Sequence, residues 1–527
     1  MLVHIEGAKG LSRFLQNSTI TFTFAMGNIF MGKYDIIIIG SGLGGLVCAN
    51  TLSKEGYKVC VLEKNSAFGG CLRSYNRKDR IIDTGIHYVG RLDEGQILNQ
   101  YFKYMGILDR LKLRRLDDDG YDIIRLTDNE YKHAMGNENF IETLSQAFPE
   151  EKENIRRMVN QFKNVGNLIS VETLSKQHLF SDDVLPYFNC SASAFLKENT
   201  PNQALRNVIA GATILSGGEE ENTPLYTFST ILNSNIESSY RFVDGSQQVA
   251  DLMIEKIQAQ GGVVRNRSEV TRLVVKNDRI TGVEINRSEY IEGDSFISGV
   301  HPAALLNILD KTKYIKKAYI SRIHSLRNST GFFTLSILLK KNSFPYLNRN
   351  YYYFEENNPW INPDYAKRGK RKVFFSTSAS SGSDSYAKVV QILEPMYWSE
   401  VAGWENTSID KRGEEYAAFK QQRAEELINY IEQFHPGLKQ AIEEYSTSTP
   451  LTYRDYTGTR EGSAYGIIKD YNDVLICLLP VKTKIPNLYI TGQNNNVHGM
   501  IGVFLTAMYT CSEFVGAHYL AKKVANV

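Results

Sequence analysis

The chain has 527 residues, more than the roughly 100 to 200 of an ordinary single domain, so the sequence predicts two domains. Hydrophobic residues make up 42% and charged residues 22%, a balance typical of a folded globular protein and not of a disordered chain. Sixty basic against 58 acidic residues give a formal net charge of +2, which argues against a broad nucleic-acid-binding surface.

The first 30 residues precede a natural start, because Met31 begins the run MGKYDIIIIG. We interpret residues 1–30 as an extension or a misassigned start. The alternative is a weak signal peptide, since the apolar run ITFTFAMGNIFMG follows Lys9 and Arg13. GNIFMGK at 27–33 matches G-x-x-x-x-G-K, but the strand follows the motif instead of preceding it, so the context excludes a P-loop. No apolar run approaches the roughly 18 to 20 residues that a membrane-spanning helix needs.

The six cysteines lie far apart, and none forms a C-x-x-C pair. This pattern favours buried free thiols in a reducing compartment, and hence a cytoplasmic location, over a disulfide framework or a zinc site. The sequence also has no H-E-x-x-H motif or other metal-ligand spacing. We therefore expect no metal site.

A dinucleotide-binding motif begins at the isoleucine-rich run 34–39, which has the composition of a buried parallel strand. GSGLGG follows at once, with Gly40, Gly42 and Gly45 at the three glycine positions of G-x-G-x-x-G, and a helical apolar pattern comes next. These glycines permit a tight turn, close approach to a pyrophosphate and close packing of helix on strand. A second strand, YKVCVLE, ends in Glu63, about 20 positions after the central glycine, where an acid binds ribose hydroxyls.

Three further segments favour FAD over NAD. NSAFGGCLRS follows the ribose acid and resembles the second glycine motif of the amine oxidase and phytoene desaturase superfamily, although Gly69 and Gly70 could also form an ordinary turn. The segment 239–285 predicts a helix, a Gly-Gly turn, a short strand carrying Val270 and a β-hairpin. The segment 485–520 predicts a strand, a glycine-bearing loop and an amphipathic helix, and resembles the closing motif of that superfamily.

The strings GGCLRS, IDTGIHYVGRLDEG and NLYITGQNNNVHGMIGVFLTA together closely resemble the retinol saturase-like branch of the phytoene desaturase and carotenoid isomerase family. The resemblance covers most of residues 33–520 and is dense only in the cofactor segments. It implies an α/β fold in which a Rossmann-type FAD-binding domain is interleaved with an α+β substrate domain. It also implies non-covalent FAD and an apolar polyene or isoprenoid substrate, whose C=C bond is saturated, desaturated or isomerised.

The resemblance assigns 31–100, 235–305 and 450–527 to the FAD-binding domain, and 101–234 and 306–449 to the substrate domain. The cofactor contacts that it implies come from the glycine motifs, the ribose acid, the hairpin and the closing loop. They are Gly40, Gly42, Leu43, Gly44, Gly45, Glu63, Lys64, Gly69, Gly70, Arg73, Gly85, His87, Val270, Gly492, Gln493, Met500, Ile501 and Gly502.

Reduction of a C=C bond needs a hydride at one carbon and a proton at the other. His87 is the lead candidate for the proton donor, and His301, His498 and Tyr465 also lie in segments expected near the flavin ring. For each, the alternative is a loop residue that hydrogen-bonds to backbone.

Two aromatic-rich segments, 348–360 and 392–404, suit a long conjugated substrate, and ordinary core strands are the alternative. Two basic segments, KTKYIKK at 311–317 and AKRGKRK at 366–372, are either solvated surface or a site for peripheral membrane association.

The resemblance implies a saturase first. The alternatives are a desaturase or isomerase on the same fold, and a prenyl-lipid binding protein without redox chemistry, like the GDP-dissociation inhibitors. The last alternative predicts an eroded nucleotide site, whereas the glycines and Glu63 are intact here. No second G-x-G-x-x-G unit is present for NAD(P), so the external electron donor, for which NAD(P)H is a candidate, binds transiently or is a separate protein.

Overall fold

The computed structural model describes residues 32–175, 184–362, 369–382 and 385–527. The predicted N-terminal extension, 1–30, lies outside the described residues with its signal-peptide alternative. So do most of the G-x-x-x-x-G-K match and residues 366–368 of the second basic segment. Lys33–Val527 form one compact unit. Among the described residues, no helix is long and apolar enough to cross a membrane.

The first sheet carries the predicted dinucleotide motif. Its strands follow the order β10-β2-β1-β13-β12-β11, and β19 pairs with β13. They span β1 (Tyr34–Ile39), β2 (Val59–Leu62), β10 (Val263–Arg265), β11 (Val270–Lys276), β12 (Arg279–Ile285), β13 (Glu289–Ser298) and β19 (Leu488–Ile490). The five strands β10, β2, β1, β13 and β19 are parallel, and β11 and β12 add an antiparallel hairpin.

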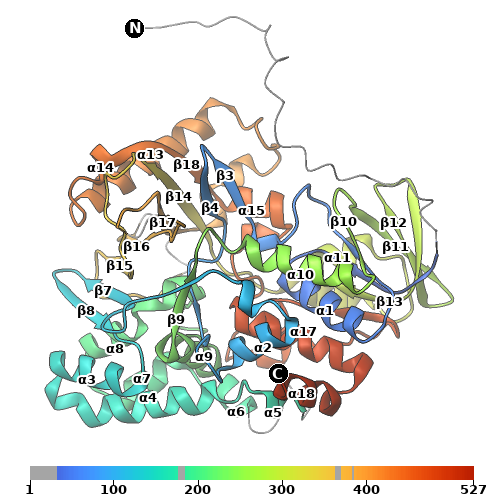
Figure 1. Ribbon diagram of the computed structural model, residues 1–527, viewed down its shortest axis with the longest axis horizontal. Coiled ribbons are helices and arrows are strands. Elements are labelled where there is room, and N and C mark those ends of the chain that lie inside the picture. Colours follow the sequence, from blue (N-terminus) through green and yellow to red (C-terminus); the bar gives the residue numbers. More distant parts are fainter. Residues whose placement is uncertain (1–31, 176–183, 363–368, 383–384) are drawn as a thin grey trace, which may run out of the picture. The chain divides into compact units, whose positions relative to one another are not determined.

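The predicted order of strand, glycine turn, helix and second strand is confirmed. Helix α1 (Leu43–Lys54) follows β1 directly, and it packs against α10 (Gln247–Ala259) and α17 (Gly499–Val515) beside the first sheet (Figure 1). One detail of the prediction is wrong. The turn at Gly261 places the short strand β10 alongside β2, so Val270 opens the hairpin strand β11 instead of lying in the short strand.

The second sheet follows the order β18-β14-β17-β16-β15-β7-β8. Its strands are β7 (Asp122–Leu126), β8 (Asn129–His133), β14 (Gly331–Leu339), β15 (Asn350–Phe354), β16 (Lys372–Thr377), β17 (Val389–Met396) and β18 (Ile442–Ser448). Helix α13 (Gly413–Glu432) covers one face, and α3 (Asn137–Ala147), α4 (Lys152–Gly166) and α9 (Leu225–Glu237) cover the other (Figure 1). All nine residues of β14 are therefore buried.

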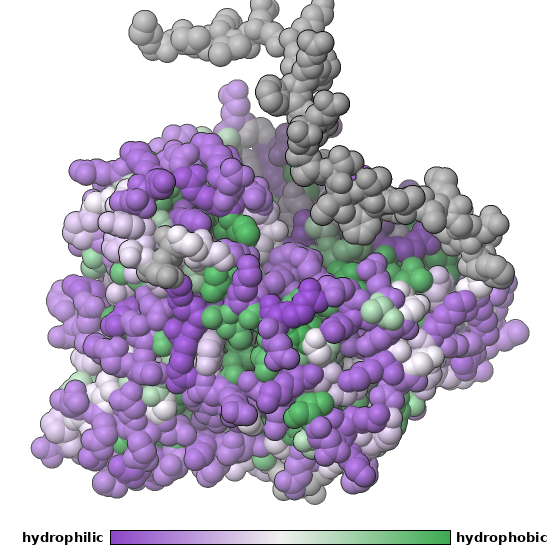
Figure 2. Space-filling model, in the orientation of Figure 1, coloured by the Kyte–Doolittle hydropathy of each residue, from purple (hydrophilic) through white to green (hydrophobic). Residues whose placement is uncertain are grey.

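The two faces of the second sheet belong to separate apolar clusters. Phe374 and Phe332 pack with the helices α3, α4 and α9, whereas their chain neighbours Phe375 and Phe333 pack with α13. This alternation follows from the period of two in a strand. Figure 2 shows that one face of the molecule is mostly hydrophilic, with hydrophobic residues visible mainly toward its centre.

The strands of the two sheets come from separate parts of the chain. The first sheet takes its strands from 34–62, 263–298 and 488–490, and the second from 122–133 and 331–448. This membership supports the interleaved FAD-binding and substrate domains, whose boundaries stay a prediction.

Smaller elements complete the fold. They are β3 (Ser74–Arg77), β4 (Arg80–Asp83), β5 (Val89–Gly90), β6 (Leu113–Arg115), β9 (Ser239–Phe242), α2 (Ile97–Met105), α5 (Val171–Ser175), α6 (Leu185–Phe188), α7 (Ala192–Asn199), α8 (Gln203–Ile209), α11 (Pro302–Ile308), α12 (Lys317–Ser325), α14 (Leu438–Ala441), α15 (Pro450–Thr457), α16 (Val474–Cys477) and α18 (Ala517–Ala525). Strands β5, β9 and β6 form a three-stranded sheet.

The loop DTGIHYVGRLDEG is fixed to the helical layer by Arg91, which is buried. Its Nε donates to Glu237 at 2.7 Å, and its Nη1 donates to the backbone oxygen of Gly166 at 2.8 Å. Gly90 lies so close to α9 that an added Cβ would come within 2.1 Å of the backbone oxygen of Ser234. The arginine and this glycine of the loop therefore serve packing against α9 and α4.

We predict that Arg91→Ala strongly destabilises the protein. The side chains of Arg91 and Glu237 are 7% and 14% exposed, and removal of one partner of a buried ion pair costs about 3–5 kcal/mol because the other charge stays buried. The control is Arg110→Ala, which breaks the exposed pair with Glu255 and should change stability far less. Urea unfolding of both variants measures the difference, and equal midpoints would contradict the structural role of Arg91.

Candidate functional site

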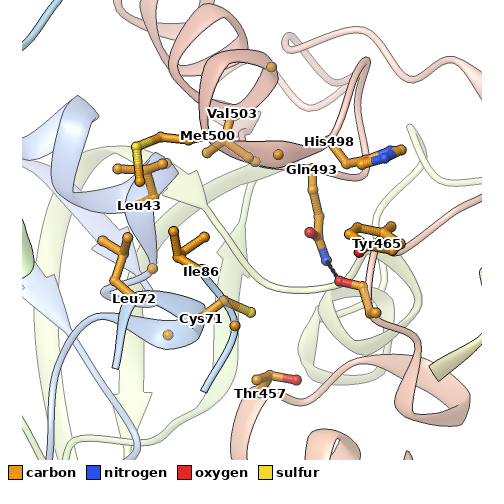
Figure 3. A pocket seen from close by; sticks show the side chains of 18 of the residues that line it. Leu43, Cys71, Leu72, Ile86, Thr457, Tyr465, Gln493, His498, Met500 and Val503 are labelled. Carbon is orange, nitrogen blue, oxygen red and sulfur yellow. Dashed lines mark hydrogen bonds between the residues drawn. The ribbon is translucent and has the colours of Figure 1, made fainter. Parts of the chain in front are cut away.

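One cavity of about 470 Å³ brings the predicted site residues together. Every predicted cofactor contact lines it except Arg73, and the other candidates His301, His498 and Tyr465 line it as well. The guanidinium of Arg73 instead covers the ring of Tyr456, a residue that lines the cavity, at 5.7 Å. Figure 3 shows side chains from both ends of the chain facing one another, with Leu43 and Leu72 on one side and Gln493 on the other.

The N-terminus of α1 opens into this cavity. Its first turn contains no acidic residue, and no side chain caps it, so its backbone N–H groups are available to an anion. The helix lies close to β1 because position 45 is glycine, where an added Cβ would come within 2.2 Å of the Gly40 oxygen. This geometry fits the pyrophosphate of a dinucleotide.

The carboxylate of Glu63 joins the two glycine motifs. Its Oε2 accepts hydrogen bonds from the backbone N–H and the hydroxyl of Ser41 at 3.0 and 2.7 Å. Its Oε1 accepts from the backbone and side-chain nitrogens of Asn65 at 2.9 and 2.8 Å. The Ser41 oxygen also accepts from the backbone N–H of Gly69 at 3.1 Å. Because Glu63 is buried and held on both oxygens, it presents a fixed acceptor for ribose hydroxyls.

The closing loop and α17 form the opposite wall. Helix α17 has no acid in its first turn, and Met500, Ile501 and Gly502 of that turn line the cavity. Gln493 is held in place by a hydrogen bond from its Nε2 to the Ala464 oxygen at 3.3 Å, which Figure 3 marks. A helix N-terminus and an amide at this wall suit the polar edge of a flavin ring.

His498 precedes α17, and its ring packs on Tyr465 with the centroids 4.6 Å apart. Burial lowers the pKa of His498 to about 3, and the positive charge of Lys469 adds to the effect. Its Nε2 is buried without a hydrogen-bond partner among the described residues. A polar atom of a bound ligand could form a hydrogen bond with this nitrogen.

His87 is held by Gln391. The His87 Nδ1 lies 2.8 Å from Gln391 Oε1, and Gln391 Nε2 donates to the backbone oxygen of Asp83 at 2.6 Å. This second bond fixes the amide orientation, so Nδ1 carries the proton and Nε2 carries the lone pair. Burial lowers the pKa of His87 to about 4, which leaves the ring neutral near pH 7. A role for His87 as proton donor stays a prediction, and this geometry does not support it.

His301 caps a helix. Its Nδ1 accepts from the backbone N–H of Ala303 at 3.2 Å, at the start of α11, and its Nε2 donates to Asn328 at 2.8 Å. Both ring nitrogens are thus occupied. The alternative of a loop histidine bonded to backbone describes His301 well.

The substrate end of the cavity is apolar, but the two predicted aromatic segments contribute little to it. Within 348–360 and 392–404, only Leu393 lines the cavity, and the tyrosines of β15 pack mainly in the sheet and against the region of α13. The core-strand alternative is right for the tyrosines of β15, whereas Trp398 and Trp404 lie in 3₁₀ turns after β17. Aromatic side chains at the cavity come instead from Tyr88, Phe228 and Phe332, among others. These residues lie on a loop, a helix and a strand, so no local run in the sequence marked them.

Sequence reasoning also missed Ser41 and Asn65, although Ser41 lies inside the glycine motif and Asn65 lies two residues after Glu63. Their positions beside the ribose acid were the available signal. Among the residues that the structure describes, no group of histidine, cysteine or acidic side chains could hold a metal ion.

Comparison with known proteins identifies the family of the chain. Residues 43–513 match the model of the flavin-containing amine oxidoreductase family. The chain belongs to that family. It is an FAD-dependent oxidoreductase, and the open α1 N-terminus, Glu63 and the α17 wall fit FAD.

Several individual proteins resemble this flavin-containing oxidoreductase over most of its length. All-trans-retinol 13,14-reductase from Rattus norvegicus is 25% identical over 91% of this chain and 85% of its own length. Prolycopene isomerase 2 from an Oncidium hybrid is 26% identical over 82% and 75%, respectively. A crystal structure of an oxidoreductase from Methanosarcina mazei has a TM-score of 0.60 at 15% identity and covers 90% of this chain and 99% of that one. That structure shares the fold.

We predict that Glu63→Ala weakens FAD binding. The change removes the acceptor for the ribose hydroxyls, and a lost hydrogen bond to a charged group costs about 1–3 kcal/mol, or roughly ten- to a hundredfold in affinity. It also leaves the N–H groups of Ser41 and Asn65 without their partner. Glu292→Ala, at an exposed position of β13, is the control. Fluorescence titration of the apoprotein with FAD gives both dissociation constants, and unchanged affinity in Glu63→Ala would contradict the assignment.

Proposed function

We propose that this protein uses FAD to reduce a carbon–carbon double bond of a neutral, hydrophobic polyene or isoprenoid substrate. One observation carries the proposal. The aspartate, glutamate, lysine and arginine side chains that line the cavity, within the described part of the chain, are Glu63, Lys64 and Glu269 alone. All three lie beside the first sheet, where the nucleotide motif is, so the substrate end offers no carboxylate to a protonated amine.

The residues that would hold FAD follow from the cavity. The first turn of α1 would face the pyrophosphate, Glu63 would bind the ribose, and Val270 would lie against the adenine. Gln493 and the first turn of α17 would face the flavin ring. Bound FAD supplies the hydride chemistry. The protein's own part is to place the substrate bond, exclude water and deliver a proton.

The substrate wall suits a long apolar chain. Ile209, Phe228, Ile231, Phe332, Leu393 and Tyr465 line it. Contact with these side chains removes an apolar substrate from water and excludes water from the reacting bond. The names of the relatives agree with such a ligand, since the rat protein is a retinol reductase.

Isomerisation or desaturation on the same fold is the second candidate, because prolycopene isomerases are also among the relatives. A lipid-binding protein without redox chemistry is disfavoured by the intact nucleotide site. A protein without redox chemistry has no need to retain an uncapped α1 N-terminus or a Glu63 carboxylate that accepts four hydrogen bonds.

The FAD-loaded protein should reduce all-trans-retinol or all-trans-β-carotene under anaerobic conditions with NADH, NADPH or dithionite as reductant. Mass spectrometry of the extracted product should find a gain of two hydrogens. A loss of two hydrogens would favour desaturation, and a shifted retention time without a mass change would favour isomerisation. A purified protein that stays colourless after incubation with FAD would contradict the flavoenzyme function altogether.

We also propose that the protein docks on an anionic membrane surface through residues 311–320, as a route for a lipid-soluble substrate. Lys311, Lys316 and Lys317 are exposed, and Ile320 is exposed on the helix that follows. Lysines meet lipid headgroups while an apolar side chain enters the interface. In the second basic segment, by contrast, Arg371 is paired with Glu394 and Glu426. The predicted cytoplasmic location is compatible with such docking.

Flotation with vesicles that contain phosphatidylserine tests this docking. The wild-type protein should float at low salt and much less at 1 M salt, where the Debye length is about 3 Å. A Lys316→Glu, Lys317→Glu double variant should not float. A Lys522→Glu, Lys523→Glu variant makes the same change of charge on α18 and is the control. Equal flotation of both variants would contradict the proposal.

A further inference from the structure

Tyr88 follows His87 in the chain and lines the same cavity. Its hydroxyl donates to Asp122 Oδ2 at 3.0 Å and lies 2.7 Å from the hydroxyl of Tyr352. Asp122 and Tyr352 are fully buried, whereas Tyr88 keeps part of its surface accessible. The three side chains thus form a hydrogen-bonded path from the cavity into the second sheet.

Among the described residues, no cation contacts the carboxyl group of Asp122 directly. Its Oδ1 accepts from Asn350 Nδ2 at 2.8 Å, and Asn350 Oδ1 in turn accepts from Arg241 at 2.7 Å. Arg241 also donates to the backbone oxygens of Leu347 and Arg349. Burial raises the pKa of Asp122 to about 7, and the hydrogen bonds from Asn350 and Tyr88 and the charge of Arg241 oppose this rise. Near neutral pH this carboxyl can therefore hold a proton and release it.

Five titratable or charged groups surround Asp122: Tyr88, Tyr121, His133, Arg241 and Tyr352. Of these groups and Asp122 itself, Asp122 is the one whose protonation changes near pH 7. Burial raises the pKa of all three tyrosines well above the usual value. Burial lowers the pKa of His133 to about 4, so that ring is neutral.

We propose that the Tyr88 hydroxyl donates the proton in the reduction and that Asp122 restores it. This inference rests on the proposed reduction of a C=C bond. When one carbon takes the hydride, the π electron pair moves to the other carbon, which takes the proton as the O–H bond of Tyr88 breaks. The phenolate oxygen then takes the proton of the Asp122 carboxyl. The substrate gains two hydrogens, bound FAD would supply the two electrons and an external two-electron donor would replace them, and a proton from water returns to the buried Asp122 through the Tyr88 hydroxyl after the product leaves.

Tyr88 suits this step better than its neighbour His87. The His87 proton is on Nδ1 and is directed at Gln391, so its Nε2 can only accept. When Asp122 is ionised, the Tyr88 O–H donates to it, but when Asp122 holds a proton its carboxyl donates to the Tyr88 oxygen and leaves the Tyr88 O–H free for the substrate. The hydroxyl of Tyr352 can also donate to that oxygen as negative charge develops. A donor backed by an acid with a pKa near the working pH meets the usual requirement for general acid catalysis.

Single-turnover reduction of all-trans-retinol or all-trans-β-carotene by the dithionite-reduced holoenzyme tests the relay. Tyr88→Phe should slow the reduction by about 10²- to 10⁴-fold, the usual range for loss of a general acid, while FAD content and the rate of flavin reduction by dithionite stay unchanged. Tyr353→Phe is the matched control. It removes the hydroxyl of a buried tyrosine on β15 that is bonded to His435 at 2.7 Å and does not line the cavity, so this variant should react like the wild type.

Proton delivery is separated from a structural role by its isotope and pH signatures. In the wild type the rate should fall as the pH rises through about 7, because ionised Asp122 accepts the Tyr88 O–H and withholds that proton from the substrate. Asp122→Asn should be slow and should lack this fall. The rate of the wild type should decrease in D₂O, and Tyr88→Phe should lose that isotope effect.

A Tyr88→Phe protein that reduces the polyene within about threefold of the wild type, or that is slowed no more than Tyr353→Phe, overturns the relay and leaves the proposed function intact. Loss of FAD by Tyr88→Phe also overturns it, because the residue is then needed for the cofactor site. A wild-type holoenzyme that converts neither polyene overturns the relay together with the proposed function.

Discussion

The carboxylate of Glu63 is the point on which the cofactor site depends. Its four hydrogen bonds fix Ser41 in the first glycine motif and Asn65 after the second strand, and Ser41 extends the network to Gly69 in the second motif. The turns that contain Ser41, Asn65 and Gly69 are thereby held in one geometry before any ligand binds. A binding site that is already in this geometry needs little reorganisation when the ligand binds, and such reorganisation would reduce the affinity.

The nucleotide half of the site could be predicted from the sequence because its signals are local. Gly40, Gly42 and Gly45 lie within six positions, and the strand before them and the acid after them follow from their own periodicity. The substrate half could not be predicted in this way. Asp122 and Tyr352 meet because β7 and β15 pair in parallel, although more than 200 residues separate them in the chain.

The motif DTGIHYVGRLDEG illustrates the same limit within one stretch. Its composition drew attention to His87, the residue type that most often transfers protons, yet the surroundings of the ring decide its protonation. Burial keeps the His87 ring neutral, and its Nδ1 is bonded to Gln391. Arg91 forms an ion pair with Glu237. Tyr88, next to His87, is the residue bonded to a buried acid, Asp122. Only the partners across the fold distinguish these roles.

The alternation in the second sheet has a consequence for how this enzyme could diversify. On β14, Phe332 lines the cavity, whereas its neighbour Phe333 belongs to the cluster under α13. A substitution of Phe332 can therefore reshape the ligand wall while the neighbouring positions keep the sheet attached to its supporting helix. A single strand thus separates the positions that can set ligand preference from the positions that hold the scaffold together.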